Sequence, residues 1–346
     1  MTKINGPINI VKLANKNKVL YLFFDIHEDL ERQTMCTDNN SIDIQEFFHE
    51  YFSNVTDDVD FFLEISNTLI SNKQFKMNNT KDIYLGNIQK WVSRNFIINE
   101  NKKINKSKFY PKVRFHFVDI RNYFENDSLF ENNEIDILTL INEFKNSINN
   151  LLNNFKTKEL NPIKKLLEKY NSSENKKIIN NYIQNTFIKK INKILLLINK
   201  KEIKMKQYLD IVNKPYNFLS KKGYGNDYKI MKKLTNKMNI FADTLVLSWL
   251  DILVYLTDIY FIRRFIDKEY IKKAYFYGGA FHNIHIILIL IKYFDFQIIN
   301  ANYINNNIKD VNKIIKENKS DNPYDLIEIF YPPVLNQCTE LPTWFN

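Results

Sequence analysis

The chain has 346 residues, of which 45% are hydrophobic and 14% aromatic, so it can bury a large core and is not a disordered protein. Only 6 Gly and 8 Pro occur, which excludes collagen-like and linker-rich architectures. The net charge of +10 is uneven, because residues 151–240 hold 21 Lys, no Arg and six acidic residues, a net +15 that leaves −5 for the rest.

The first part of the chain alternates short apolar runs with helical patterns. Residues 19–24, 59–65 and 112–120 are apolar runs rich in β-branched and aromatic residues and predict strands. Between them, residues 42–52 and 81–96 carry apolar side chains at helical spacing and predict helices.

The second part begins with a long helical region. Residues 134–239 show only helical, Lys- and Asn-rich sequence, and residues 243–265 predict a buried helix. A fourth strand is predicted at 272–277, followed by a helix over 281–293 and a fifth strand at 296–300. The last forty residues predict a helix and an irregular tail.

Strands that alternate with helices predict an α/β fold with a mostly parallel sheet flanked by helices. The helical region interrupts this pattern and predicts a long basic all-helical insertion. We therefore expect residues 1–130 plus 240–346 to form an α/β core domain and residues 131–239 to form a Lys-rich helical insertion.

Residues 241–262 approach the length of a membrane span but contain Asp243, Asp251 and Asp258. The spacings of eight and seven place these carboxylates near one helical face, which is typical of a buried helix with a polar stripe. Each would cost roughly 2.5–3.5 kcal/mol at the centre of a bilayer, so no membrane span is expected. The first residues lack the apolar stretch of a secretory signal.

Only two cysteines occur, Cys36 and Cys338, which excludes a disulfide framework and a thiolate zinc site. Two alternatives stay open for them. They are either reduced thiols, as is usual in the cytosol, or a single bond that joins the two ends of the chain.

Chemically reactive side chains follow the predicted strands. Asp25 and His27 follow the first strand, Glu64 the second, and Asp119 and Arg121 the third. In open α/β sheets, ligands bind beyond the carboxyl ends of parallel strands, so we expect these side chains to line one pocket.

The fourth strand leads through Gly278 and Gly279 into a helix with His282 and His285. A glycine pair before a helix leaves backbone N–H groups for an anion. We expect His285 to be structural, since it lies one turn deeper along the helix. The candidate catalytic residues are therefore Asp25, His27, Glu64, Asp119, Arg121 and His282.

Imidazole and carboxylate groups bind divalent transition metals, and a metal-bound water is a nucleophile near neutral pH. The candidate metal ligands are His27, Glu64, Asp119 and His282, and Arg121 would neutralise an anionic group on the substrate. The same residues also have structural explanations as helix caps, an Asp119–Arg121 ion pair and a satisfied half-buried histidine.

Several segments resemble the paralogous proteins of giant amoeba-infecting viruses of the mimivirus kind. The resemblance implies a viral origin and assigns no activity. The matching segments cover both flanks and skip the helical middle: residues 5–13, 19–36, 60–65, 113–121, 258–265 and 275–286.

The strand-end residues also resemble the erythromycin-esterase-like, ChaN-like and Tiki-like α/β superfamily. Asp25-Ile26-His27, Glu64 and Gly279-Ala280-Phe281-His282 correspond to its Gly-Glu-x-His motif, middle acid and Gly-x-x-His motif. This sequence departs from the pattern at Phe24, which replaces a glycine, and at Asp25, where glutamate is common.

Three classes of function follow. The first is a metal-dependent hydrolase, active or degenerate, with its site at the carboxyl edge of the sheet. The second is a non-catalytic interaction protein of the virion or virus factory. The third is a nucleic-acid-associated protein that uses the basic helices of residues 151–240. The viral resemblance implies the host cytoplasm or the virion as its location.

Overall fold

The computed structural model of the chain describes residues 2–28, 31–37, 40–65, 83–98, 104–121, 136–156, 168–212 and 224–345. The chain divides into two compact units. The first unit comprises residues 1–122, 170–175 and 257–346, and the second comprises residues 123–169 and 176–256. The sequence predicts domain boundaries at 130/131 and 239/240. The first boundary lies outside the described residues. The second unit continues past the second boundary, to residue 256.

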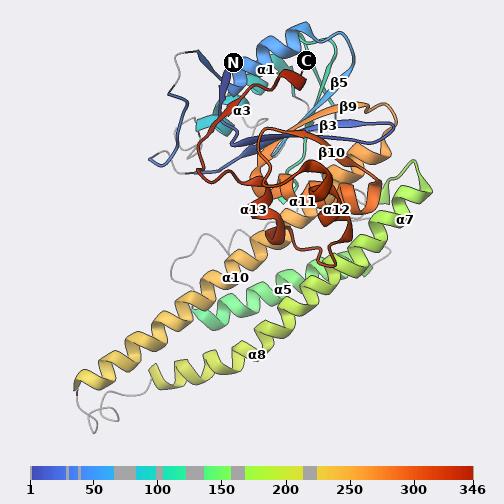
Figure 1. The fold of residues 1–346 in the computed structure, drawn as a ribbon. Coiled ribbons are helices and arrows are strands. Elements are labelled where there is room, and N and C mark those ends of the chain that lie inside the picture. Colours follow the sequence, from blue (N-terminus) through green and yellow to red (C-terminus); the bar gives the residue numbers. More distant parts are fainter. Residues whose placement is uncertain are drawn as a thin grey trace. The chain divides into compact units, whose positions relative to one another are not determined.

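An eight-stranded sheet forms the centre of the first unit (Figure 1). Its strands lie in the order β10 (Gln297–Ala301), β2 (Asn9–Ala14), β3 (Val19–Asp25), β9 (Lys273–Gly279), β5 (Val59–Leu63), β8 (Val113–Phe117), β7 (Asn105–Ser107) and β6 (Phe96–Ile97). The three central pairs, β3–β9, β9–β5 and β5–β8, are parallel. The four pairs on either side of them are antiparallel.

The sheet is thus mixed, and the prediction of a mostly parallel sheet is wrong. Strand β2 forms an antiparallel hairpin with β3 through a tight turn. In that turn Asn15 Oδ1 accepts the backbone N–H groups of Asn17 and Lys18, both at 2.9 Å. Such an Asn turn substitutes for the glycine turn that usually marks a hairpin, so the hairpin has no conspicuous signal in an Asn-rich chain.

A separate three-stranded sheet joins the two ends of the chain. It has the order β11 (Cys338–Glu340), β1 (Lys3–Asn5), β4 (Ser41–Asp43). Cys36 and Cys338 form a disulfide beside it, with Cα atoms 5.0 Å apart. Of the two alternatives for the cysteines, the structure has the bond between the chain ends.

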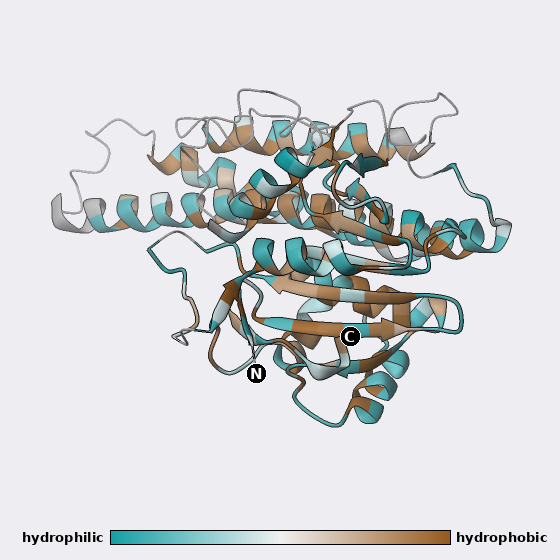
Figure 2. Cartoon of the chain, turned by 90° about the horizontal axis from the view of Figure 1, so that it is seen from above, coloured by the Kyte–Doolittle hydropathy of each residue, from teal (hydrophilic) through white to brown (hydrophobic). Residues whose placement is uncertain are grey.

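Helices α1 (Ile44–Asn54) and α3 (Ile83–Asn95) pack on one face of the eight-stranded sheet around an aromatic core. Alternate residues of the central strands, such as Phe23, Phe61 and Tyr277, enter this core. Both faces of these strands are covered, so most of their residues are apolar, and much of the sheet is brown in Figure 2.

The other alternate residues of the central strands pack against α11 (Ala280–Phe294) and the 257–267 end of α10 (Tyr224–Asp267). Phe62 and Phe276 lie with ring centroids 5.0 and 4.8 Å from that of Phe261. The unit is completed by α12 (Ile308–Glu317), η4 (Pro323–Leu326), α13 (Ile327–Phe330) and η5 (Thr343–Phe345).

The second unit contains long helices. They are α5 (Ile137–Lys156), most of α7 (Ser173–Tyr182), the π-helical turn η2 (Ile183–Phe187), α8 (Ile188–Val212) and residues 224–256 of α10. Phe144 of α5 packs edge-on against Trp249 of α10, and Lys190 of α8 pairs with Asp251 at 2.5 Å.

Among the described residues, one helix is long and apolar enough to cross a membrane, the 229–267 part of α10. In the most apolar stretch of this helix, 67% is buried inside the structure. The core helix of a soluble protein passes the same test, so the helix is weakly consistent with the expected absence of a membrane span.

Candidate functional site at the carboxyl edge of the parallel strands

The four central strands all end at the same edge of the sheet. Asp25, the last residue of β3, lies opposite Gly279, the last residue of β9. Glu64 directly follows β5, and Asp119 and Arg121 follow β8. This order brings the polar residues behind each strand close together.

Glu64 lies at the centre of this cluster and is buried. Its Oε2 accepts the backbone N–H of Gly279 at 2.7 Å and lies 3.6 Å from His27 Nε2. Its Oε1 lies 3.0 Å from His282 Nε2 and 3.5 Å from an Arg121 nitrogen. Burial would raise the pKa of Glu64, but His282 and His27 outweigh it and hold that pKa well below its usual range.

This packing leaves little room for a side chain at either glycine. A Cβ at Gly278 would lie 2.9 Å from Glu64 Oε2, and one at Gly279 would lie 3.1 Å from His27 Nε2. The glycine pair was expected to offer a backbone N–H to an anion. The N–H of Gly279 binds such a group, the carboxylate of Glu64.

Asp258 of α10 forms a second, fully buried layer beneath Glu64. Its two oxygens lie 2.6 Å from Nδ1 of His282 and 2.6 Å from Nδ1 of His285. Burial disfavours the charged form of His282, yet Asp258 and Glu64 raise its pKa to about 10. His282 is therefore an imidazolium held between two carboxylates.

Asn283, in the first turns of α11, fixes the strand ends beneath the cluster. Its Nδ2 donates to the carbonyl oxygens of Phe23, Gly278 and Gly279 at 2.8–3.1 Å. One buried amide thus ties the ends of β3 and β9 to the helix that carries His282.

Two members of the cluster reach the surface. The side chain of His27 is 40% exposed and lies 3.4 Å from Asp25. The side chain of Arg121 is 36% exposed, and Asp119 holds it by two hydrogen bonds of 2.9 and 2.7 Å. Such a bidentate pair fixes the plane of the guanidinium.

The structure thus brings all six candidate residues into one network around Glu64. Two residues of the network, Asp258 and Asn283, were not among the candidates chosen from the sequence. A signal for Asp258 was present, because a carboxylate in a long apolar helical stretch needs a buried partner. His285, expected to be structural, is fully buried.

No group of three or more His, Cys, Asp or Glu side chains in the described part of the chain is placed to hold a metal ion. The four candidate ligands instead face each other and Arg121. The positive charge in the cluster comes from Arg121 and His282. This arrangement can exchange protons at His27 and bind an anion at Arg121.

The chain thus contains a mixed α/β unit with a buried histidine–carboxylate network, and a helical unit. The chain belongs to the family of unknown function DUF5847, which matches residues 2–161 and 149–346. The predicted resemblance to giant-virus paralogues is confirmed.

Three relatives from Acanthamoeba polyphaga mimivirus illustrate this similarity. Uncharacterized protein R706 is 25% identical over 98% of this chain and 95% of its own length. Uncharacterized protein R161 is 27% identical over 99% and 96%, respectively. Uncharacterized protein R129 is 37% identical over 34% of this chain and 73% of its own length. No solved structure matches the chain. The resemblance to the erythromycin-esterase-like superfamily stays a prediction.

Proposed function

We propose that the chain is a hydrolase for an ester that carries an anionic group, with its site at the carboxyl edge of the parallel strands. One observation carries the proposal: a buried network presents two accessible groups of complementary function. Glu64, Asp119, Asp258 and His282 are buried, whereas His27 and Arg121 reach solvent.

In the proposed reaction His27 acts first as a general base and then as a general acid. It takes a proton from water as the water oxygen bonds to the electrophilic atom of the ester. It then returns the proton to the leaving oxygen as the ester bond breaks. Asp25 lies 3.4 Å from Nδ1 of His27 and would stabilise the protonated ring. Nε2, on the side of the ring that faces Glu64, would take the proton.

Arg121 would pair with the anionic group and position the ester beside His27. Asp119 keeps the guanidinium in one plane, and Glu64 lies 3.5 Å from it. A metal-dependent form of the proposal would use His27, Glu64, Asp119 and His282 as ligands, and the metal would supply an activated water. It would require His282 to give up the proton that it holds between Glu64 and Asp258.

The test is hydrolysis of p-nitrophenyl phosphate and p-nitrophenyl acetate by the full chain, with and without EDTA, Zn²⁺ or Mn²⁺. We expect His27→Ala to lower kcat/KM about 100-fold or more. His49→Ala is the matched control, because His49 is an exposed histidine on α1 outside the cluster.

The conditions with EDTA and with added metal distinguish the two forms of the proposal. Activity that survives EDTA supports proton transfer by His27, whereas loss with EDTA and recovery with metal supports the metal-dependent form. Arg121→Lys should raise KM more for the phosphate ester than for the acetate. Turnover by the wild type no greater than by His27→Ala, with or without metal, would overturn the proposal in favour of a non-catalytic interaction protein.

A second candidate function is association with nucleic acid through the second unit. Lys189, Lys193, Lys200 and Lys204 of α8 are exposed, and their spacing places them on one side of the helix. None of them has an ion pair with the described residues, whereas Lys190 and Lys206 do.

Retention of duplex DNA on a filter, measured over a range of salt concentrations, tests this function. Four phosphate contacts predict a slope of log Kobs against log salt near −3.6, from about −0.9 per contact. Changing the four lysines to glutamine should abolish the slope. Retention that does not depend on salt would contradict the nucleic-acid function.

A further inference from the structure

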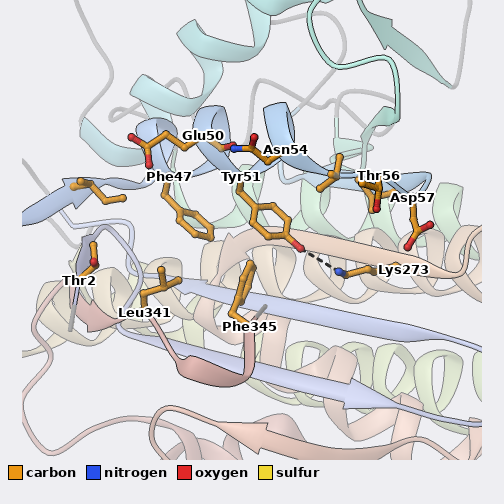
Figure 3. Close-up of a pocket in the computed structure, with 13 residues that line it drawn as sticks. Thr2, Phe47, Glu50, Tyr51, Asn54, Thr56, Asp57, Lys273, Leu341 and Phe345 are labelled. Atoms are coloured by element: carbon orange, nitrogen blue, oxygen red, sulfur yellow. Dashed lines mark hydrogen bonds between the residues drawn. The ribbon is translucent and has the colours of Figure 1, made fainter.

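A cavity of about 480 Å³ lies at the other edge of the sheet, at the amino ends of the parallel strands. Val59 and Lys273, the first residues of β5 and β9, form part of its wall. Figure 3 shows the rings of Phe47, Tyr51 and Phe345 side by side along it. These rings form an aromatic wall, as in many ligand pockets, and the rest of the lining includes polar residues such as Thr2, Asn54 and Thr56.

Lys273 supplies a positive charge to this lining. Its Nζ donates to Tyr51 Oη at 3.0 Å, shown as the dashed line in Figure 3, and Tyr51 Oη lies 2.6 Å from Tyr275 Oη. The same Nζ lies 5.6–5.7 Å from the ring centroids of Tyr21, Tyr51 and Tyr275. These contacts hold the ammonium in one place.

No carboxylate of the described residues lies within ion-pair distance of Lys273. An ammonium has three donors, and Tyr51 uses one of them here. The remaining hydrogen-bonding capacity and the unneutralised charge suit an anionic oxygen at the cavity wall.

The rim of the cavity limits the charge of the ligand. Glu50 and Asp57 are exposed there, and α1 ends at Asn54 with its carbonyl groups toward this end of the helix. Carboxylates and a helix C-terminus both disfavour negative charge nearby. A ligand with one negative charge fits this site better than a dianion.

We propose that this cavity binds an apolar monocarboxylate, with its carboxylate on Lys273 and its apolar part along the wall formed by Phe47, Val55 and Phe345. The site is independent of the hydrolase proposal, because it uses none of the residues at the carboxyl edge.

The experiment is calorimetric titration of the full chain with octanoate, 1-octanol and octyl phosphate. We expect octanoate to bind at one site per chain and more tightly than either of the other two. Lys273→Met should weaken octanoate binding at least tenfold and leave 1-octanol binding within twofold.

Lys12→Met is the matched control, because Lys12 also lies over the Tyr21 ring, at 5.3 Å, but does not line the cavity. It should leave octanoate binding unchanged. Val55→Trp, which fills the cavity from its wall, should abolish binding of both octanoate and 1-octanol and provides a second test should Lys273→Met fail to fold.

Three results would overturn the inference. They are equal weakening by Lys12→Met and Lys273→Met, equal affinity for octanoate and 1-octanol, and tighter binding of octyl phosphate than of octanoate.

Discussion

Two buried histidines on the same face of the sheet differ in their partners and therefore in their charge. His282 lies between two carboxylates, whereas His116 lies between Asp60 and Arg264. Arg264 donates to His116 Nδ1 at 2.7 Å, so His116 Nε2–H donates to Asp60 at 2.6 Å. Burial and Arg264 lower the pKa of His116 to about 4 despite the Asp60 hydrogen bond.

The two pKa shifts have opposite consequences for stability. The contribution of His282 is present below pH 6.5, the usual histidine pKa, and is lost as the pH rises toward 10. His116 contributes fully above pH 6.5, and its contribution is lost as the pH falls toward 4, because the unfolded chain then binds a proton that the folded chain does not.

The first prediction concerns His116. His116→Gln removes this titrating group. When the pH falls from 6.5 to 4, the unfolding free energy of the variant should therefore decrease by about 3 kcal/mol less than that of the wild type. At pH 7 it should be less stable by about 1–3 kcal/mol, because Gln satisfies Asp60 and Arg264 less well. Urea unfolding at several pH values measures both effects.

Parallel pH curves for His116→Gln and the wild type would mean that His116 titrates alike in the folded and unfolded chain.

At the scale of elements, the strand ends were predictable and the sheet topology was not. Strands β3, β5, β8, β9 and β10 all occur where the sequence predicts strands, and the first four lie in runs rich in apolar and aromatic residues. Polar residues behind such runs have to lie at the edge of the sheet, and this is why the six site residues could be chosen.

Strands β1, β4 and β11 have three residues each, too few to show any periodicity. Their positions depend on pairing between segments far apart in sequence, such as Asn5 with Cys338. Likewise, Asp258 reaches the site only because α10 packs on the sheet, which no local pattern specifies.

The loop behind β3, which carries His27, is attached to the C-terminal segment by more than the disulfide. Gln337 Nε2 donates to the carbonyl oxygen of Ile26 at 3.1 Å. Thr34 and Gln337 also exchange two hydrogen bonds, of 2.8 and 3.2 Å. The Cys36–Cys338 bond therefore joins two segments that hydrogen bonds already hold together.

The second prediction concerns this bond, which spans 302 residues of sequence. The double variant Cys36→Ser/Cys338→Ser should lose about 2–5 kcal/mol of unfolding free energy, because the unfolded chain is no longer cross-linked. Urea unfolding of the wild type in dithiothreitol should reproduce the curve of the double variant. A wild-type curve unaffected by dithiothreitol would contradict the prediction.

At the scale of the whole molecule, a short segment returns to the first unit from the middle of the helical one. Residues 170–175 belong to the first unit, although the chain on both sides of them belongs to the second. The backbone N–H groups of Asn171 and Ser172 donate to Asp267 at 2.7–2.8 Å. Asp267 is buried, so these bonds satisfy a carboxylate at the end of α10.

The third prediction is that the first unit folds without the second if this segment is kept. A chain of residues 1–122, 170–175 and 257–346, joined by Gly/Ser linkers, should unfold cooperatively in urea. Replacing 170–175 by linker as well should cost about 1–3 kcal/mol, because Asp267 loses its backbone donors and keeps only the Lys268 ammonium at 3.0 Å. Asp267→Asn should destabilise the first shortened chain more than the second. A shortened chain that aggregates with 170–175 present would show that the first unit depends on the second, and equal stability of the two chains would show that the segment contributes nothing.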